Sequence, residues 1–162
     1  MSVLAVNGRV DKGKLVKEIL IPVVGGMVTG MLATRNAKEK YRKLRQPDYA
    51  PPSWVFPVMW TGLYATMGLA NYRVSMKKEP TAAAETLYDI QLGLNFLWSF
   101  FFFKWNLRGT AFAEIGLLLG MITLTTYQYY QKDKIAGRLM LPYIAWVSYA
   151  LQLNYSMWKL NK

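Results

Sequence analysis

The sequence contains no cysteine and no histidine. Without cysteine the chain forms no disulfides, carries no thiolate nucleophile and holds no cysteine-bound metal. Without histidine it lacks the commonest general base, the commonest transition-metal ligand and the usual axial ligand of haem iron. It also has no phosphate-binding glycine loop and no HExxH motif. We therefore expect no conventional hydrolase or metalloenzyme, no metal site and no bound cofactor.

Charge is also scarce, at 18% of 162 residues, whereas 53% are hydrophobic and 15% aromatic. This composition is too apolar and too rich in rings for an ordinary soluble domain with one core. The net charge is +11, but the 20 Lys and Arg residues are spread over every loop. They form no groove-sized basic stripe with base-stacking rings, so we expect anionic lipid headgroups, not nucleic acid, as the partner of this charge.

Five uncharged blocks approach the length of about 20 apolar residues that a transmembrane helix needs. They predict an all-α fold, an integral membrane bundle of five transmembrane helices. The single five-helix domain covers residues 16–161, with an N-terminal tail at 1–15 and spans at about 16–34, 53–74, 85–103, 110–130 and 139–158. Lys and Arg divide evenly between the two sides, and only the density of the 35–52 loop weakly favours the cytoplasm for that loop.

Two features of the predicted spans each allow two interpretations. Gly26 and Gly30 form a GxxxG pattern, which is typical of close packing within the chain or of a homodimer contact. The aromatic residues between Pro47 and Tyr72 form either a belt at the lipid headgroups or the wall of a ligand pocket. Indoles on three different spans can stack on a flat apolar molecule, with amide side chains to orient it. The residues in question are Trp54, Trp60, Trp98 and Trp146, with Gln91, Asn95 and Asn154.

Two smaller signals also concern binding. Glu114 lies within the fourth predicted span, where a carboxylate is either functional or paired with a nearby cation. Leu153, Tyr155 and Lys159 match a short pattern proposed for cholesterol contact. An interfacial anchor explains Tyr155 and Lys159 equally well.

Motifs in residues 41–68, 91–98, 141–146 and 153–158, in this order, resemble the tryptophan-rich sensory protein family, also called the translocator protein or peripheral benzodiazepine receptor family. The resemblance implies a five-helix bundle, often homodimeric, whose pocket accepts porphyrins, sterols and benzodiazepine-type ligands. By position it implies ligand contacts from Pro51, Trp54, Asn95, Trp98, Glu114, Trp146, Ala150 and Leu153. It places the sterol segment at Leu153, Tyr155 and Lys159.

This chain also departs from the family, and two of the departures concern binding. Lys40 stands where an aromatic residue often precedes Tyr41, and Lys159 replaces the arginine typical of good sterol binders. We therefore do not expect tight cholesterol binding, and we expect an altered ligand preference.

The leading hypothesis is a membrane receptor or transporter for tetrapyrroles such as protoporphyrin, with a role in stress regulation. The alternatives are an enzyme that degrades porphyrin with light and oxygen, using Trp54 and Trp146, and a structural membrane scaffold. Because the N-terminal segment has no Arg/Ser-rich leader, we expect a bacterial plasma membrane, with the mitochondrial outer membrane as the alternative.

Overall fold

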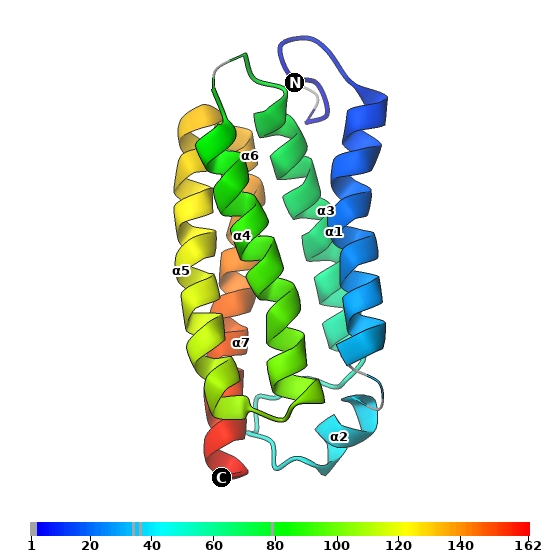
Figure 1. Ribbon diagram of the computed structural model, residues 1–162, viewed down its shortest axis with the longest axis vertical. Helices are drawn as coiled ribbons and strands as arrows, with labels where there is room; N and C mark the ends of the chain where they lie inside the picture. The colour runs from blue at the N-terminus through cyan, green and yellow to red at the C-terminus, as the bar shows by residue number, and fades with distance from the viewer. Residues whose placement is uncertain (1–2, 34, 36, 79) are drawn as a thin grey trace.

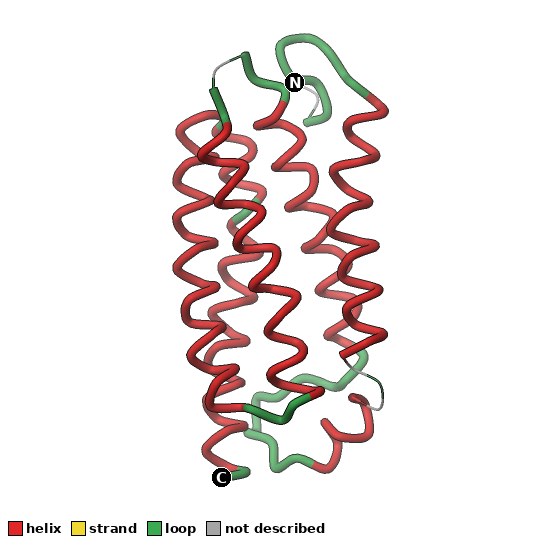
Figure 2. The backbone as a smooth tube through the Cα atoms, in the orientation of Figure 1, coloured by secondary structure: helices red, strands yellow, loops and turns green. Residues whose placement is uncertain are grey.

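The structure, a computed structural model, describes residues 3–33, 35, 37–78 and 80–162. Over these residues it contains seven α-helices and one π-helical segment, and no strand beyond one isolated bridge between Val6 and Arg9. Figure 2 shows this helical content along the backbone. The prediction of an all-α fold is confirmed.

Long helices run alternately down and up the molecule (Figure 1). They are α1 (Lys12–Ala33), α3 (Val55–Ser75), α4 (Ala82–Ser99), α5 (Arg108–Lys132), and the consecutive pair α6 (Lys134–Leu139) and α7 (Leu141–Leu160). A short helix, α2 (Ala37–Lys43), lies across one end. We call this the α2 end; it holds residues 37–54, 104–107 and the C-terminus. The opposite end, here the N-terminal end, holds residues 3–11 and the turns that follow α3 and α5.

Each predicted span lies within one helix or a consecutive pair, with differences at the boundaries. The first helix begins at Lys12, and Thr34, the expected end of that span, lies outside the described residues. The third span ends in the π-helical segment η1 (Phe100–Lys104), where the amide of Trp105 donates to the carbonyl of Phe100 at 2.8 Å. The fifth is broken between α6 and α7, because Pro142 belongs in the first turn of a new helix, where its missing N–H costs least.

By length and composition, two of the described helices, α1 and α5, are apolar enough to cross a membrane. The other long helices are less apolar because they carry polar side chains on their inner faces, including Asn71, Gln91 and Asn154, all buried. The count of five spans therefore stays a prediction.

The first helix packs chiefly against α3. An added Cβ at Gly68 would collide with the backbone of Glu18 and Ile19, so this glycine allows the two helices to approach closely. Gly26 lies against the ring of Tyr64 in the same interface, whereas a Cβ on Gly30 would meet open space. Of the two interpretations of the GxxxG pattern, Gly26 thus serves packing within the chain. A homodimer stays a prediction, and Gly26 is not free to contribute to it.

The predicted tail is folded onto the N-terminal end. The hydroxyl of Tyr72 donates to the carbonyl of Leu4 at 3.0 Å and accepts from the amide of Asp11 at 3.1 Å. Arg73 donates to the carbonyls of Val3 and Ala5, and its Nε lies 2.9 Å from Asp133 Oδ2. The side chain of Arg73 is 6% exposed and that of Asp133 is 5% exposed. A buried ion pair therefore joins α3 to the start of α6 and holds the N-terminal segment in place.

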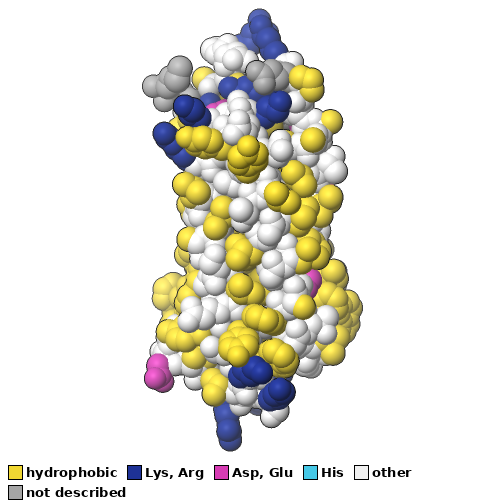
Figure 3. All heavy atoms as spheres, turned by 90° about the vertical axis from the view of Figure 1, so that its left-hand side faces the viewer, with side chains coloured by type: hydrophobic (Ala, Val, Ile, Leu, Met, Phe, Trp, Pro, Cys, Tyr) yellow, Lys and Arg dark blue, Asp and Glu magenta, His cyan; other side chains and the backbone are white. Residues whose placement is uncertain are grey.

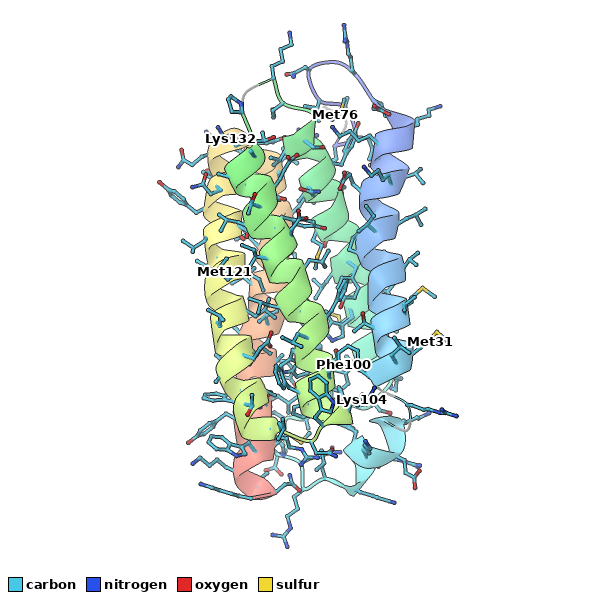
Figure 4. The ribbon with its side chains drawn as sticks, viewed as in Figure 1. Met31, Met76, Phe100, Lys104, Met121 and Lys132 are labelled. Carbon is cyan, nitrogen blue, oxygen red and sulfur yellow. The ribbon has the colours of Figure 1, made fainter. Side chains whose placement is uncertain are left out.

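Apolar side chains cover much of the outer surface between the ends. In Figure 3, Lys and Arg gather at the two ends of the face over α5, and uncharged side chains dominate the band between them. Met31 points away from the bundle in Figure 4 and is 75% exposed. Such a surface suits a hydrocarbon environment and not water.

Candidate functional site

A small apolar cavity lies inside the α2 end. Its volume is about 10 Å³, which is about the space of one water molecule, whereas sites for drug-sized ligands measure about 300–1,000 Å³. Residues from α2, α3, α4, η1 and α7 line it: Tyr41, Phe56, Trp98, Phe102, Phe103, Ala150, Leu153 and Asn154. The cavity is therefore apolar and too small for such a ligand in this conformation.

Indoles from three helices meet beside the cavity. Trp60 of α3 has its ring centroid 6.5 Å from that of Trp98 on α4 and 6.3 Å from that of Trp146 on α7. Trp98 stacks on Phe102 at 5.1 Å, and Phe56 contacts Trp146 edge to face at 6.0 Å. Such ring pairs add stabilisation beyond the area they bury. The cluster presents a flat, polarisable surface next to the cavity.

Polar side chains form a hydrogen-bonded chain further into the bundle. Tyr64 donates to Asn95 Oδ1 at 2.6 Å, Asn95 Nδ2 donates to the hydroxyl of Tyr143 at 2.6 Å, and Tyr143 donates to Gln91 Oε1 at 2.8 Å. These bonds join α3, α4 and α7. Buried amides need such partners in an apolar interior, so the chain sets the rotation of each helix about its own axis.

A second polar contact anchors the indole of the cavity wall. Trp98 Nε1 donates to Asn154 Oδ1 at 2.9 Å, and Asn154 Nδ2 donates to the carbonyl of Arg108 at 3.0 Å. One side chain on α7 thus fixes both the Trp98 ring on α4 and the start of α5.

The segment 37–54 forms a roof over the cavity. Tyr41 donates to the carbonyl of Pro51 at 2.6 Å, and Lys40 Nζ donates to the carbonyl of Phe103 at 3.0 Å. Burial, with a smaller contribution from Tyr149, raises the pKa of Tyr41 to about 12, so its hydroxyl remains a donor at neutral pH. These contacts tie the roof to itself and to η1.

Further bonds tie the roof to α7. The amide of Arg45 donates to Asn161 Oδ1 at 2.9 Å, and Asn161 Nδ2 donates back to the carbonyl of Arg45 at 2.9 Å. Tyr149 donates to the carbonyl of Tyr49 at 2.7 Å. These bonds lie near the surface, so each contributes little to holding the roof closed.

The structure brings most of the predicted ligand residues together. Trp98, Ala150 and Leu153 line the cavity, Asn95 and Trp146 lie in the adjoining clusters, and Pro51 supplies a carbonyl to the roof. Trp54 and Glu114 are the exceptions. The side chain of Trp54 is 64% exposed, which is typical of an interfacial anchor.

Glu114 is buried on α5, at 8% exposure. Neither of its carboxylate oxygens has a hydrogen-bond partner among the described residues. It does not line the cavity. The expectation of a pairing with a nearby cation is thus not met in this conformation.

Within the sterol pattern, Leu153 lies on a different face of α7 from Tyr155 and Lys159, which neighbour each other one turn apart. Leu153 is buried against the cavity, whereas Tyr155 is 44% exposed and Lys159 is exposed, with its Nζ 4.8 Å from the ring of Trp158. A single sterol surface does not include all three. Tyr155 and Lys159 have the arrangement of an interfacial anchor.

Several parts of the site were not predicted from the sequence. Trp60 was named among the stacking indoles but not among the implied ligand contacts, although it joins the other two indoles, and Phe56, Phe102 and Phe103 were not singled out. The uninterrupted run of phenylalanines at 100–103 was the available signal. The π-helical turn determines which of the four phenylalanines line the cavity, and no sequence pattern predicted this turn.

Comparison with known proteins identifies the family of the chain. Residues 18–159 match the TspO/MBR family. The chain is 33% identical to the translocator protein of Homo sapiens over 88% of this chain and 86% of that protein. It is 37% identical to the tryptophan-rich sensory protein of Cereibacter sphaeroides over 76% and 77%, respectively. It is 34% identical to the tryptophan-rich protein TspO of Chlorobaculum tepidum over 84% and 88%.

Proposed function

The chain belongs to the TspO/MBR family of membrane proteins, and from that premise we propose that it is a five-helix membrane receptor or transporter for porphyrins. Sterols are the second proposed ligand class. The observation that carries the proposal is the convergence of Trp60, Trp98 and Trp146 beside a roofed apolar cavity. Such a surface suits a flat aromatic ligand.

Five crossings are supported by the arrangement of the helices and their surfaces. α3 and α7 contain 21 and 20 residues, or about 30 Å at 1.5 Å per residue, close to the thickness of the hydrocarbon core. Exposed aromatic residues lie near both ends, with Tyr127 and Tyr130 at one and Trp54 and Trp105 at the other. These positions fit two interfacial belts.

The absence of cysteine makes the crossings directly testable. Single cysteines at Lys43, Lys78, Lys104 and Arg138 will be labelled from one side of sealed vesicles with a membrane-impermeant maleimide. We expect Lys43 and Lys104 to share one side, and Lys78 and Arg138 the other. Labelling of all four positions from the same side would contradict five crossings.

Binding requires the roof to move, because the cavity is far smaller than a porphyrin. The contacts that must break are those of segment 37–54 with itself, η1 and α7. The apolar body of the ligand then lies against Trp98 and near Trp146, and Asn95 and Glu114 supply polar groups at its inner edge. Pro51, Ala150 and Leu153 complete the wall.

The test is a titration of protoporphyrin into purified protein in the dark, followed by tryptophan fluorescence. We expect saturable quenching that weakens in Trp146→Ala. The matched control is Trp54→Ala, which removes an exposed indole outside the cluster and should leave affinity unchanged. Quenching that does not saturate, or equal affinities in the wild type and Trp146→Ala, would contradict the proposed pocket.

A second candidate function is the light- and oxygen-dependent degradation of bound porphyrin. The observation that favours it is the short spacing of Trp60, Trp98 and Trp146, which places oxidisable rings next to the proposed ligand. Trp54 has no part in it, because it lies outside the cluster. Illumination of the complex should then yield a defined product in the wild type, and none in Trp146→Phe at equal ligand occupancy.

For the cellular role we propose stress-linked sensing or efflux of porphyrin in a bacterial plasma membrane, with the mitochondrial outer membrane as the alternative. The name of the Cereibacter sphaeroides relative, a sensory protein, and its 37% identity support this assignment. Deletion of the gene should change the porphyrin content of the cell under oxidative stress. An unchanged content would contradict the proposed role.

A further inference from the structure

Two cations lie next to residues of the cavity wall and have no carboxylate partner among the described residues. Lys40 Nζ bonds to the carbonyl of Phe103, and the guanidinium carbon of Arg108 lies 5.9 Å from the ring centroid of Phe102. Both phenylalanines line the cavity. Within the described part of the chain, the ion pairs join Lys43 to Glu39, and Arg73 and Lys77 to Asp133. Lys40 and Arg108 therefore bring positive charge to the cavity rim that no carboxylate of the described chain pairs with.

Arg108 also holds a buried donor that has no acceptor. Its Nε is shielded from solvent and lacks a hydrogen-bond partner among the described residues. A guanidinium cannot lose its proton in a protein, and a buried donor without an acceptor costs free energy. In native structures such a group usually indicates a missing ligand or water.

The same residue lines an open groove at the surface of the α2 end. The groove has a volume of about 330 Å³, and its lining includes Asn106, Arg108, Trp158, Asn161 and Lys162, but no Asp or Glu among the described residues. Arg108 thus lies between a small apolar cavity, through Phe102, and an open basic groove. A ligand with an apolar body and an acidic edge matches this pair of environments.

We propose that Arg108 and Lys40 bind the carboxylates of the ligand, so that the site selects flat apolar acids over neutral molecules such as sterols. The planar fork of arginine pairs with both oxygens of a carboxylate. The ammonium of Lys40 has three donors, and its bond to Phe103 uses one. This inference rests on the proposed function and names the ligand class more narrowly.

The experiment compares protoporphyrin, which has two carboxylates, with its uncharged dimethyl ester. Both are titrated into the full chain in nanodiscs of neutral phosphatidylcholine, for the wild type, Arg108→Gln, Arg108→Lys and Lys40→Gln. The matched control is Arg42→Gln, which removes an exposed arginine from the same end of the bundle. Circular dichroism and gel filtration establish that each variant is folded.

We expect Arg108→Gln to weaken binding of the acid about tenfold, as for a lost charge-assisted pair, and to leave the ester within about twofold. Arg108→Lys should recover only part of the loss, because lysine lacks the fork. Lys40→Gln should weaken binding of the acid about threefold, since lysine is a point charge without the fork of arginine, and Arg42→Gln should change the affinity for neither ligand. Equal effects of Arg108→Gln on acid and ester would overturn the inference.

The outcomes also separate this inference from the proposed function. If the wild type binds neither compound, the proposed function fails. If the wild type binds both compounds equally and Arg108→Gln changes neither affinity, porphyrin binding is supported and the proposed carboxylate site is wrong. If Arg108→Gln does not fold, the salt dependence of binding to the wild type is the test. The affinity for the acid must fall as the salt concentration rises, and the affinity for the ester must not.

An anionic lipid headgroup is the other source of an acceptor for Arg108. If a lipid phosphate is its partner, Arg108→Gln will retain less phosphatidylglycerol on purification and bind protoporphyrin as the wild type does. That result would also overturn the proposal. Retention of lipid equal to that of the wild type, with weaker binding of the acid, supports it.

Discussion

At the N-terminal end of the bundle an arginine and an aspartate are buried and paired, whereas at the α2 end Lys40 and Arg108 lie near a cavity without a carboxylate partner among the described residues. Arg73 and Asp133 form a buried ion pair that also holds the N-terminal segment. The roof at the α2 end is instead closed by hydrogen bonds between the backbone and the side chains of Lys40 and of neutral residues, several near the surface. Opening the N-terminal end would leave a buried charge without its partner. Opening the α2 end would only replace hydrogen bonds within the protein by hydrogen bonds to water. For the proposed function, this difference favours ligand entry through the α2 end.

The largest expected effect tests the closed end. Asp133→Ala leaves the guanidinium of Arg73 buried and unpaired and removes the cap of α6, in which Asp133 Oδ1 accepts from the amide of Ile135 at 2.9 Å. We expect the free energy of unfolding to fall by about 3–5 kcal/mol, measured by denaturant titration in detergent. The control, Glu39→Ala, breaks the exposed pair with Lys43 and should cost less than about 1 kcal/mol. Similar losses in the two variants would contradict the comparison.

The next effect tests how tightly α1 is held to α3 toward the N-terminal end. Gly68→Ala places a methyl group against the backbone of Glu18, and backbone cannot move aside as a flexible side chain can. We expect a loss of about 1–3 kcal/mol in thermal or chemical unfolding. Gly62→Ala, on the same helix and facing open space, should be neutral or stabilise by up to about 1 kcal/mol. If both substitutions behave alike, the close contact does not exist in solution.

A weaker roof should change the rate of ligand association more than the stability of the fold. Tyr41→Phe removes the 2.6 Å bond to the carbonyl of Pro51 and should lower the free energy of unfolding by about 1 kcal/mol. If that energy holds the roof closed, the association rate of protoporphyrin should rise about fivefold. Stopped-flow tryptophan quenching measures the rate. Tyr127→Phe, exposed on α5, is the control, and a rate unchanged by Tyr41→Phe would mean that the roof does not limit entry.

The smallest effect concerns the bonds between the roof and α7. Asn161→Ala removes two exposed hydrogen bonds to the backbone of Arg45. We expect the free energy of unfolding to fall by less than about 1 kcal/mol, and protoporphyrin to associate about twofold faster in the same stopped-flow assay. Ser148→Ala, whose hydroxyl bonds only within its own helix, should match the wild type. A slower association in Asn161→Ala would show that the bonds guide the ligand instead of closing the roof.

Part of the site follows from sequence patterns. The apolar runs predict the long helices to within a few residues, and the motifs place Asn95, Trp98, Trp146, Ala150 and Leu153 in one region, where the structure also has them. The motifs that carry the family resemblance are therefore mostly inward-facing residues, whose identity the packing of the bundle restricts.

Other features were beyond any sequence pattern. Trp54 and Trp60 lie in the same aromatic segment, yet one is 64% exposed and the other joins the central indole cluster. Leu153 and Tyr155 belong to one short motif and face opposite environments. In a membrane protein both faces of a helix are apolar, so hydrophobic periodicity does not distinguish the interior from the lipid side.

By itself, then, the sequence determined the helical membrane class, the family and which residue types are available for chemistry, because these depend on composition, length and local motifs. Only the tertiary structure decided how each helix is rotated, that Gly26 packs against Tyr64, that the tail is folded onto Arg73, and that Lys40 and Arg108 each contact a phenylalanine that lines the cavity. Those arrangements depend on contacts between segments far apart in the chain, such as the bond of Lys40 to Phe103. Their energies become available only when the helices have packed together.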